Sequence, residues 1–294
     1  MQSSIILGVD IGGSHITSAL VDLDHRKILQ GSFNREKINS AGSAEAIKTA
    51  WAEVLTKSLK ATSNSKIVGI AMPGPFDYQN GISYISGLNK YDSLYNLNIK
   101  ELLIQWLYPL VEEILFVNDA ACFLQGEVFA GAGKRYNKIL GLTLGTGFGS
   151  ATFENNLVLN ADYWNFPFLD SICEDFFSSS WFIKRHLELT SRKVLNVKEI
   201  VENITNFHAK NDIFDEFSEN LANLLTGILK EKDYNAIIFG GNISQASGLF
   251  LPRLKKNLEQ RLFKVDLLVS ELGEDAALIG AASFVNSFKL NISS

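Results

Sequence analysis

The sequence predicts an α/β protein of two lobes, each a mixed sheet with flanking helices. The chain has 294 residues, the size at which a single hydrophobic core stops growing and chains divide. Short β-branched runs alternate with longer segments of helical period in both halves. Several of the short runs end in a glycine pair or an acidic residue, which places polar loops at the ends of the predicted strands.

The amino-terminal half predicts the first lobe. Three apolar runs joined by tight turns indicate strands over 4–9, 16–23 and 28–33 that begin an antiparallel sheet. Apolar residues at helical spacing then predict a helix over 43–59, and a buried strand over 67–71 stops at Pro73. The remaining elements are an irregular loop, a helix, a strand and a helix, over 77–98, 99–110, 114–117 and 120–130.

The carboxy-terminal half predicts the second lobe. Strands are expected over 138–144, 150–153, 236–239 and 265–269. Helices are expected over 212–229, 249–262, 275–284 and within 168–189, where the start lies near Asp170 or Ser171. We expect the boundary at Asn118, with a first lobe of 1–118, a second of 119–274, and the final helix, about 275–294, packing back on the first lobe.

Composition excludes several classes of protein. Hydrophobic residues make up 46% and charged residues 20%, and 27 basic against 32 acidic residues give a formal charge of -5. No run of five Lys or Arg occurs, so we expect no nucleic-acid partner. Two cysteines without C-x-x-C spacing predict neither a disulfide framework nor a zinc site. Without a leader pattern or a spanning apolar stretch, we expect no membrane partner and a cytoplasmic location.

The first motif is Asp10-Ile11-Gly12-Gly13-Ser14, where a strand delivers a carboxylate into a glycine turn. Glycine lets backbone N–H groups approach an anion closely, and the neighbouring acid could hold Mg²⁺ through water. An ordinary hairpin turn explains this segment equally well.

Two further glycine motifs lie in the second half. Gly145-Thr146-Gly147-Phe148-Gly149 joins two apolar strands and forms a second loop of phosphate size. It lacks the Lys-Ser/Thr of a P-loop, and a strand rather than a helix follows, unlike a dinucleotide-binding fingerprint. Gly240-Gly241 follows a strand and would let a flat base lie against the backbone. A flexible hairpin and a simple strand-to-helix turn remain open as alternatives.

The fourth motif is Asn118-Asp119, at a predicted strand end and helix start. Asp119 could be the helix N-cap. It could also be a general base that accepts a hydroxyl proton as that oxygen attacks a phosphate.

In this order the motifs resemble those of the actin-like sugar kinases, and more closely those of the repressor, open reading frame and kinase family, called ROK. The matching segments are 8–14, 72–75, 117–120, 144–147, 239–241 and 273–282. The resemblance implies the two-lobed actin-like ATPase fold, related to ribonuclease H. It also implies phosphorylation of a hexose or N-acetylhexosamine, with ATP and Mg²⁺ as cofactors.

The resemblance implies a role for each matching residue. Asp119 takes the place of the family's catalytic base, and Asp10 would hold Mg²⁺. The residues that would bind the nucleotide are Asp10, Gly12, Gly13, Ser14, Gly145, Thr146, Gly147, Gly240 and Gly241. The residues that would contact the sugar are Gly74, Asn89, Asn118, Asp162, Asn165 and Glu174.

The sequence departs from the family pattern after Leu159. Asp162 stands where the family has Glu, Asn165 where it has a zinc-binding His, and of the Cys-rich zinc knuckle only Cys173 remains. We therefore expect a zinc-free branch in which packing by Trp164, Phe166 and Phe168 replaces the metal, although sugar stacking by these rings is the alternative. A second departure is His15, where the family often has Lys.

Two other functions remain open. Family repressors carry an amino-terminal helix-turn-helix domain, for which a phosphate loop beginning at residue 8 leaves no room. The changes at Asp162 and Asn165 would suit a sugar-binding protein without catalysis. The expected partners are a sugar, ATP and, because dimers are common in the family, a second copy of the chain.

Overall fold

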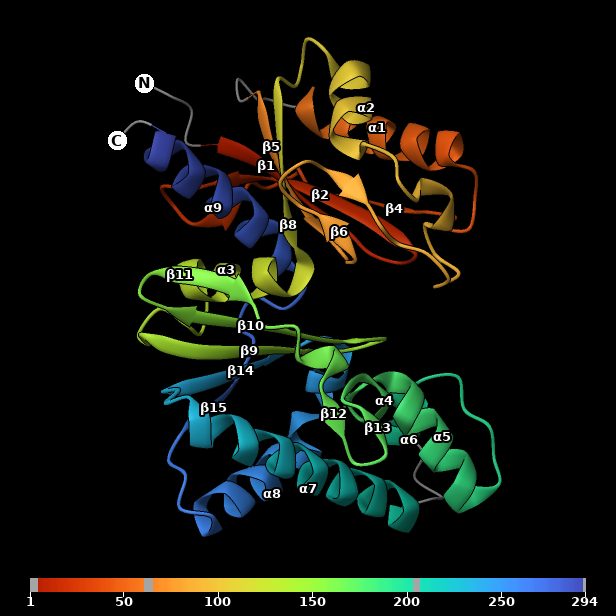
Figure 1. The fold of residues 1–294 in the computed structure, drawn as a ribbon, viewed down its shortest axis with the longest axis vertical. Helices are drawn as coiled ribbons and strands as arrows, with labels where there is room; N and C mark the ends of the chain where they lie inside the picture. Colours follow the sequence, from red (N-terminus) through yellow and green to blue (C-terminus); the bar gives the residue numbers. More distant parts are fainter. Residues whose placement is uncertain (1–4, 61–65, 203–206, 293–294) are drawn as a thin grey trace. The chain divides into compact units, whose positions relative to one another are not determined.

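The computed structural model describes residues 5–60, 66–202 and 207–292. The start of the first predicted strand at Ser4 and the last two residues of the predicted final helix lie outside these ranges. The chain forms two compact units (Figure 1). Unit 1 comprises Met1–Lys134 with Glu274–Ser294, and unit 2 comprises Arg135–Gly273.

Unit 1 is built on a six-stranded mixed sheet in the order β3-β2-β1-β5-β8, with β4 pairing β2 beside β3. Its strands are β1 (Ile5–Ile11), β2 (His15–Asp22), β3 (Lys27–Ile28), β4 (Asn34–Lys37), β5 (Ile67–Met72) and β8 (Glu113–Asn118). The pairs among β1 to β4 are antiparallel, whereas β1, β5 and β8 run parallel. Register pairs Asp10 with Ala71 and Met72 with Asn118, so the first and fourth motifs leave the sheet at one edge.

The third predicted strand, over 28–33, is wrong. Strand β3 ends at Ile28, and Gly31 adopts a φ of 79°, in the left-handed region that breaks a strand. The Ser32 hydroxyl accepts a hydrogen bond from the Leu20 N–H of β2, so a side chain takes the place of the backbone partner that a longer β3 would provide. The chain returns to β2 only at Asn34, as β4.

The α-helices in the described part of unit 1 are α1 (Ala44–Leu59), α2 (Ile99–Leu107), α3 (Asp119–Ala130) and α9 (Asp275–Ile292). Helix α1 starts at Ser43, whose hydroxyl caps it by accepting from the Ala46 N–H. The segment predicted as an irregular loop contains the small hairpin β6 (Phe76–Asp77) and β7 (Ile82–Ser83) and the short helix η1 (Asp92–Leu94).

Helix α9 packs against β1, β5 and α3 of the same unit. Because α3 is held there, the division of the chain falls after Lys134, whereas the sequence placed it at Asn118. Glycines allow this close approach: a Cβ on Gly280 would stand 1.8 Å from the Cys122 carbonyl oxygen, and one on Gly8 would stand 2.1 Å from the Leu278 carbonyl oxygen.

Unit 2 is built on a five-stranded sheet in the order β11-β10-β9-β14-β15. Its strands are β9 (Lys138–Leu144), β10 (Phe148–Glu154), β11 (Leu157–Asn160), β14 (Ala236–Gly240) and β15 (Asp266–Val269). Strands β9, β14 and β15 are parallel, and β9, β10 and β11 are antiparallel neighbours. The loops after Leu144 and Gly240 therefore leave the sheet at the same edge, side by side.

The helices of unit 2 are α4 (Glu174–Phe177), α5 (Ser179–Thr190), α6 (Val197–Glu202), α7 (Phe207–Glu231) and α8 (Ser247–Gln260), with short helices η2 (Tyr163–Asn165) and η4 (Asn242–Ala246). The prediction that a helix starts near Asp170 or Ser171 is wrong. A hairpin of β12 (Pro167–Phe168) and β13 (Ser171–Ile172) occupies that stretch. Within the described residues, no helix is long and apolar enough to cross a membrane.

The three aromatic residues of this stretch differ in burial. Phe168 is 9% exposed and packs its ring on Phe176 and Phe177, as core packing predicts. Trp164 and Phe166 are 40% and 45% exposed, so the core interpretation is wrong for these two. Trp164 lies on η2, and Phe166 lies between η2 and the β12–β13 hairpin, with its ring edge against Tyr163.

Candidate functional site

In unit 1 the predicted site residues lie at the edge where β1, β5 and β8 end. Asp10 is the penultimate residue of β1, and the turn from Gly12 to Ser14 joins β1 to β2. The Gly12 N–H donates to the His15 carbonyl oxygen over 2.9 Å, and the Ser14 carbonyl oxygen accepts from the Ile38 N–H over 2.9 Å. The turn is thus held on both sides, while Gly13 and Ser14 are exposed to solvent.

Asn118, and not Asp119, caps helix α3. The Asn118 side-chain oxygen accepts from the N–H groups of Ala120 and Ala121, over 3.0 and 3.2 Å. Its amide nitrogen donates to the Tyr78 hydroxyl, over 3.1 Å. Asp119 is the first helical residue, and its carboxylate accepts from the adjacent Ala120 N–H over 2.9 Å. The N-cap interpretation of Asp119 is therefore wrong.

Asp10 lies in an electrostatically unfavourable position for a carboxylate. Burial and, after it, the neighbouring Asp119 charge together raise the pKa of its carboxyl to about 7, while the Arg35 guanidinium opposes both. Arg35 is itself paired with Glu274 at the start of α9. Two carboxylates that repel each other at one sheet edge are suited to a cation that both would accept.

Asp119 combines solvent access with a raised pKa. The residue is exposed to solvent, so a substrate can reach it. Desolvation by the surrounding protein nevertheless raises the pKa of its carboxyl, and the Ala120 N–H and the Lys90 ammonium partly offset that rise. A reachable carboxylate with an elevated proton affinity is what a general base requires.

The loop that carries Asn89 is fixed to the glycine turn by its neighbour Tyr91. Tyr91 is fully buried, packs its ring edge on Trp51 and donates its hydroxyl to the Gly12 carbonyl oxygen. Asn89 is exposed, with a φ of 55°. Tyr91 falls within the irregular loop predicted over 77–98, and no sequence pattern indicates this contact, which joins positions 79 apart.

Gly74 lies beside Tyr78, the partner of Asn118. A Cβ at Gly74 would stand 3.3 Å from the Tyr78 hydroxyl, which donates to the Met72 carbonyl oxygen over 3.1 Å. The structure thus connects Gly74 and Asn118 through Tyr78. Sequence reasoning missed Tyr78 and also Arg35, because neither belongs to a recognisable local motif.

In unit 2 the first glycine loop is tied to two helix starts. Ser179 donates to the Gly145 carbonyl oxygen through both its N–H and its hydroxyl, over 2.7 and 2.8 Å. The Glu174 carboxylate accepts from the Phe148 N–H over 3.2 Å, and it lies 3.0 Å from where a Cβ on Gly147 would be. Thr146 is left exposed at the tip. Glu174 therefore belongs to this loop.

The second glycine loop of unit 2 requires glycine at one position. Gly241 has a φ of 80°, and a Cβ there would stand 2.3 Å from the Leu144 carbonyl oxygen. Gly240 pairs in register with Thr143 of β9. Gly240, Gly241 and the Gly145–Gly147 loop therefore form one surface at the carboxyl edge of the parallel strands.

Asp162 and Asn165 lie on the short segment around η2, and both are exposed. Asp162 has a φ of 54° and accepts from the Asn160 side-chain amide over 2.8 Å. Cys173 is buried in the apolar core, which raises its pKa to about 11. Across residues 5–60, 66–202 and 207–292, no three His, Cys, Asp or Glu side chains gather as metal ligands.

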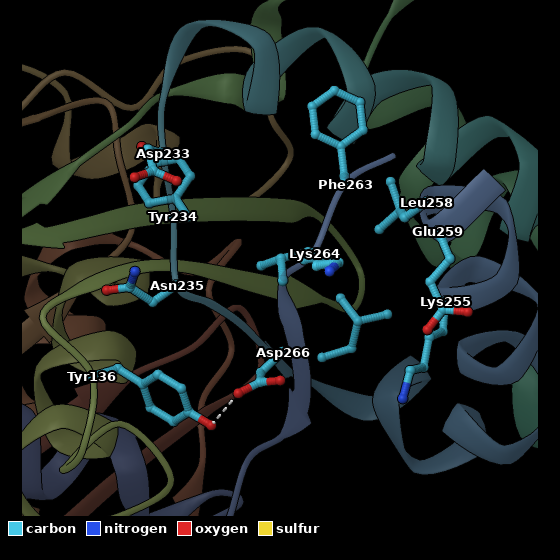
Figure 2. Close-up of a pocket in the computed structure, with 12 residues that line it drawn as sticks. Tyr136, Asp233, Tyr234, Asn235, Lys255, Leu258, Glu259, Phe263, Lys264 and Asp266 are labelled. Atoms are coloured by element: carbon cyan, nitrogen blue, oxygen red, sulfur yellow. Dashed lines mark hydrogen bonds between the residues drawn. The ribbon is translucent and has the colours of Figure 1, made fainter. Parts of the chain in front are cut away.

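A hollow of about 410 Å³ in unit 2 stands apart from these residues (Figure 2). Its lining includes Tyr136, whose hydroxyl donates to Asp266 over 2.8 Å, together with Asn235 and Lys255. Asn235 and Asp266 stand at the starts of β14 and β15, so the hollow lies at the amino edge of the sheet. The glycine loops lie at the opposite edge, and the hollow contains none of the predicted site residues.

The fold defines the class: this is an actin-like ATPase fold of the kind found in sugar kinases. A ROK family glucokinase from Streptomyces griseus, solved with glucose and AMPPNP, has a TM-score of 0.78 at 22% identity over 95% of this chain and 98% of its own. A crystal structure from Cytophaga hutchinsonii has a TM-score of 0.79 at 24% identity, over 96% of this chain and 99% of its own.

The sequence comparisons give the family. The ROK family model matches residues 6–161 and 172–287, so the chain belongs to the ROK family. A glucokinase from Thermotoga maritima is 24% identical over 315 residues, covering 95% of this chain and 96% of the relative. A xylose repressor from Bacillus spizizenii is 23% identical over 306 residues, covering 97% of this chain and 78% of the relative.

Proposed function

We propose that this protein is a kinase that transfers the γ-phosphoryl group of ATP to a hydroxyl of a hexose or N-acetylhexosamine. The observation that carries the proposal is Asp119: an exposed carboxylate with a raised pKa, freed from capping by Asn118 and close enough to Asp10 to raise the pKa of that carboxyl as well. The relatives named glucokinase and N-acetyl-D-glucosamine kinase support the substrate class.

In this reaction the sugar hydroxyl oxygen forms a bond to the γ-phosphorus while the bond to the β,γ-bridging oxygen breaks and ADP leaves. Asp119 accepts the hydroxyl proton, a contribution of about 10²–10⁴-fold for a positioned general base. Asn118 and Tyr78 hold the start of α3 so that this carboxylate keeps its direction. The remaining catalysis comes from positioning and charge stabilisation around the phosphates.

The other site residues divide by unit. We assign phosphate contacts to Gly12, Gly13 and Ser14 in unit 1 and to Gly145, Thr146 and Gly147 in unit 2, and we assign Gly240 and Gly241 to adenosine. Sugar contacts are assigned to Gly74, Asn89, Asn118, Asp162, Asn165 and Glu174. Because Glu174 accepts a hydrogen bond from Phe148, next to the Gly145–Gly147 loop, its carboxylate would contact the sugar while it supports this phosphate-binding loop.

The residues present fit Mg²⁺ at Asp10. The Asp10 carboxyl is held above its ordinary pKa by burial and by Asp119, and a divalent cation would reverse that penalty. When bound, Mg²⁺ would neutralise phosphate charge, and Asp10 would hold it directly or through water.

The family relation also supports a homodimer, which light scattering of the purified protein tests.

The deciding experiment is a coupled assay of ADP release with ATP, Mg²⁺ and glucose, N-acetylglucosamine or N-acetylmannosamine in turn. Turnover that depends on one of these sugars supports the kinase. Tight sugar binding without turnover would instead support a sugar-sensing protein, the second candidate, which the match to xylose repressors favours.

A further inference from the structure

Lys90 is a partly buried cation beside the glycine turn of unit 1. A Cβ built on Gly13 would stand 3.7 Å from the Lys90 Cδ, so the lysine stem lies against the turn. In the described part of the chain its ammonium makes no hydrogen bond or ion pair. Its charge nevertheless lowers the pKa of the Asp119 carboxyl.

The backbone around Lys90 is rigidly placed. Asn89 and Tyr91 on either side have φ values of 55° and 60°, a conformation that costs energy unless the surroundings enforce it. Tyr91 provides that enforcement through its buried ring, its hydroxyl bond to Gly12 and its N–H bond to the Ser40 carbonyl oxygen over 2.6 Å. Lys90 therefore leaves the loop at a fixed point above the turn.

The other nearby cation is already occupied. Arg35 pairs with Glu274, whereas the Lys90 ammonium acts electrostatically on the Asp119 carboxylate. An ammonium without a partner in the described structure is available to donate charge-assisted hydrogen bonds to a ligand anion. The location between the glycine turn and the proposed base is where a transferred phosphoryl group would pass.

We propose that Lys90 binds the phosphoryl group in transfer, with its ammonium donating to a γ-phosphate oxygen over the Gly12–Gly13 turn. This inference rests on the proposed kinase function and adds to it a phosphate-binding cation supplied by the sugar-side loop. The same loop would then contribute Asn89 to the sugar and Lys90 to the phosphate, so that the attacking and transferred groups are aligned by one rigid segment.

The test compares wild type with Lys90→Gln, Lys90→Arg and the matched control Lys27→Gln. Lys27 is exposed on β3, pairs in register with Asp22 at the far end of β2, and its loss changes net charge equally. We expect Lys90→Gln to lower kcat/KM for ATP by about 10- to 100-fold, the range for a hydrogen bond to a charged group. Lys90→Arg should recover most of it, and Lys27→Gln should match wild type.

Three results would overturn the inference. If Lys90→Gln has the same kcat/KM as an active wild type, Lys90 does not contact the phosphate. The same conclusion follows if Lys27→Gln loses as much activity as Lys90→Gln. A loss in Lys90→Gln that vanishes as the pH rises from about 6.5 to 9 would place the effect on ionisation of Asp119, because Lys90 lowers that pKa.

Failure of the kinase proposal is recognised separately, by a wild type that phosphorylates none of the sugars. The inference is then decided by calorimetric affinity for a non-hydrolysable ATP analogue with Mg²⁺. Weaker binding by Lys90→Gln than by wild type, with Lys27→Gln unchanged, supports the contact with phosphate; equal binding by all three overturns it.

Discussion

The hydroxyl of Tyr91 donates a hydrogen bond to the carbonyl oxygen of Gly12, which joins the proposed sugar-side loop to the proposed phosphate turn. Tyr91 is fully buried, and burial raises the pKa of its phenol well above the ordinary value. The phenol is therefore a permanent donor at any pH near neutrality. This one hydrogen bond therefore fixes the position of the Gly12–Ser14 turn relative to the loop that carries Asn89.

Tyr91→Phe removes this bond and keeps the ring packing on Trp51. We expect a loss of about 0.5–1.5 kcal/mol, the net value of an ordinary hydrogen bond. We also expect kcat/KM to fall for sugar and ATP together, because both groups of contacts would loosen. Thermal melting and steady-state kinetics measure this, with exposed Tyr84→Phe as control. Normal kinetics for a less stable Tyr91→Phe would restrict the bond to a structural role.

Asp119→Asn tests the proposed base. An amide cannot accept the hydroxyl proton, so we expect kcat to fall by at least about 10²-fold with little change in sugar affinity. The helix should stay intact because Asn118 provides the cap. Asn118→Ala is the matched comparison and should lower stability by about 1 kcal/mol. Near wild-type turnover by folded Asp119→Asn would refute the mechanism.

The motif positions were predictable from sequence because each lies at a strand end that local pattern already marks. Strand β9 has the predicted bounds, Lys138–Leu144, and β8 ends at the predicted Asn118-Asp119 junction within one residue. Buried apolar runs and glycine turns carry that information within a few residues. The same local signals fixed the order of the four motifs and hence the family.

What sequence missed depends on contacts between distant positions or on turn geometry. Nothing near Tyr91 reveals a bond to Gly12, and nothing near Asn118 reveals that Tyr78 completes its hydrogen bonding. The apolar pattern around Asp170 predicts the start of a helix, but the chain forms the β12–β13 hairpin there. Leu169 turns the chain with a φ of 49°, a conformation that is rare for leucine and that the sequence therefore does not reveal.

Asp10→Asn tests the electrostatics of the site through the pH dependence of stability. The folded pKa, about 7, exceeds the ordinary 3.8, so between these values the folded protein holds a proton that the unfolded chain has released. Stability must therefore fall as pH rises from about 4 to 7. Asn does not titrate, so the melting temperature of Asp10→Asn minus that of wild type should increase over this window.

The control for this experiment is Asp77→Asn. Hydrogen bonds from Asn80 and Gln79 lower the pKa of Asp77, so its contribution to stability is constant above pH 5. Its melting-temperature difference from wild type should be flat from pH 5 to 8. A flat difference for Asp10→Asn as well would contradict an elevated Asp10 pKa.

Metal dependence is predicted to be confined to Mg²⁺. Cys173 lies buried in the core with a raised pKa, which disfavours the thiolate that zinc requires. We expect activity to survive a zinc-selective chelator and to disappear when Mg²⁺ is withheld, with recovery on its return. Elemental analysis that finds one tightly held zinc per chain would contradict the zinc-free expectation.

Two glycine-to-alanine changes, one in α9 and one in α7, are predicted to change stability in opposite directions. At Gly280 a Cβ would lie 1.8 Å from the Cys122 carbonyl oxygen and 2.9 Å from the Gly126 nitrogen, and neither backbone atom can rotate away. We expect Gly280→Ala to destabilise unit 1 by about 1–3 kcal/mol or more, the range for overpacking.

At Gly227, inside α7, a Cβ meets nothing within 4 Å. Gly227→Ala should therefore stabilise unit 2 by about 0.5–1 kcal/mol, because alanine loses less backbone entropy in a helix. Urea unfolding of both variants beside wild type measures the two shifts, and a stable Gly280→Ala protein would show that α9 does not pack against α3 at this distance.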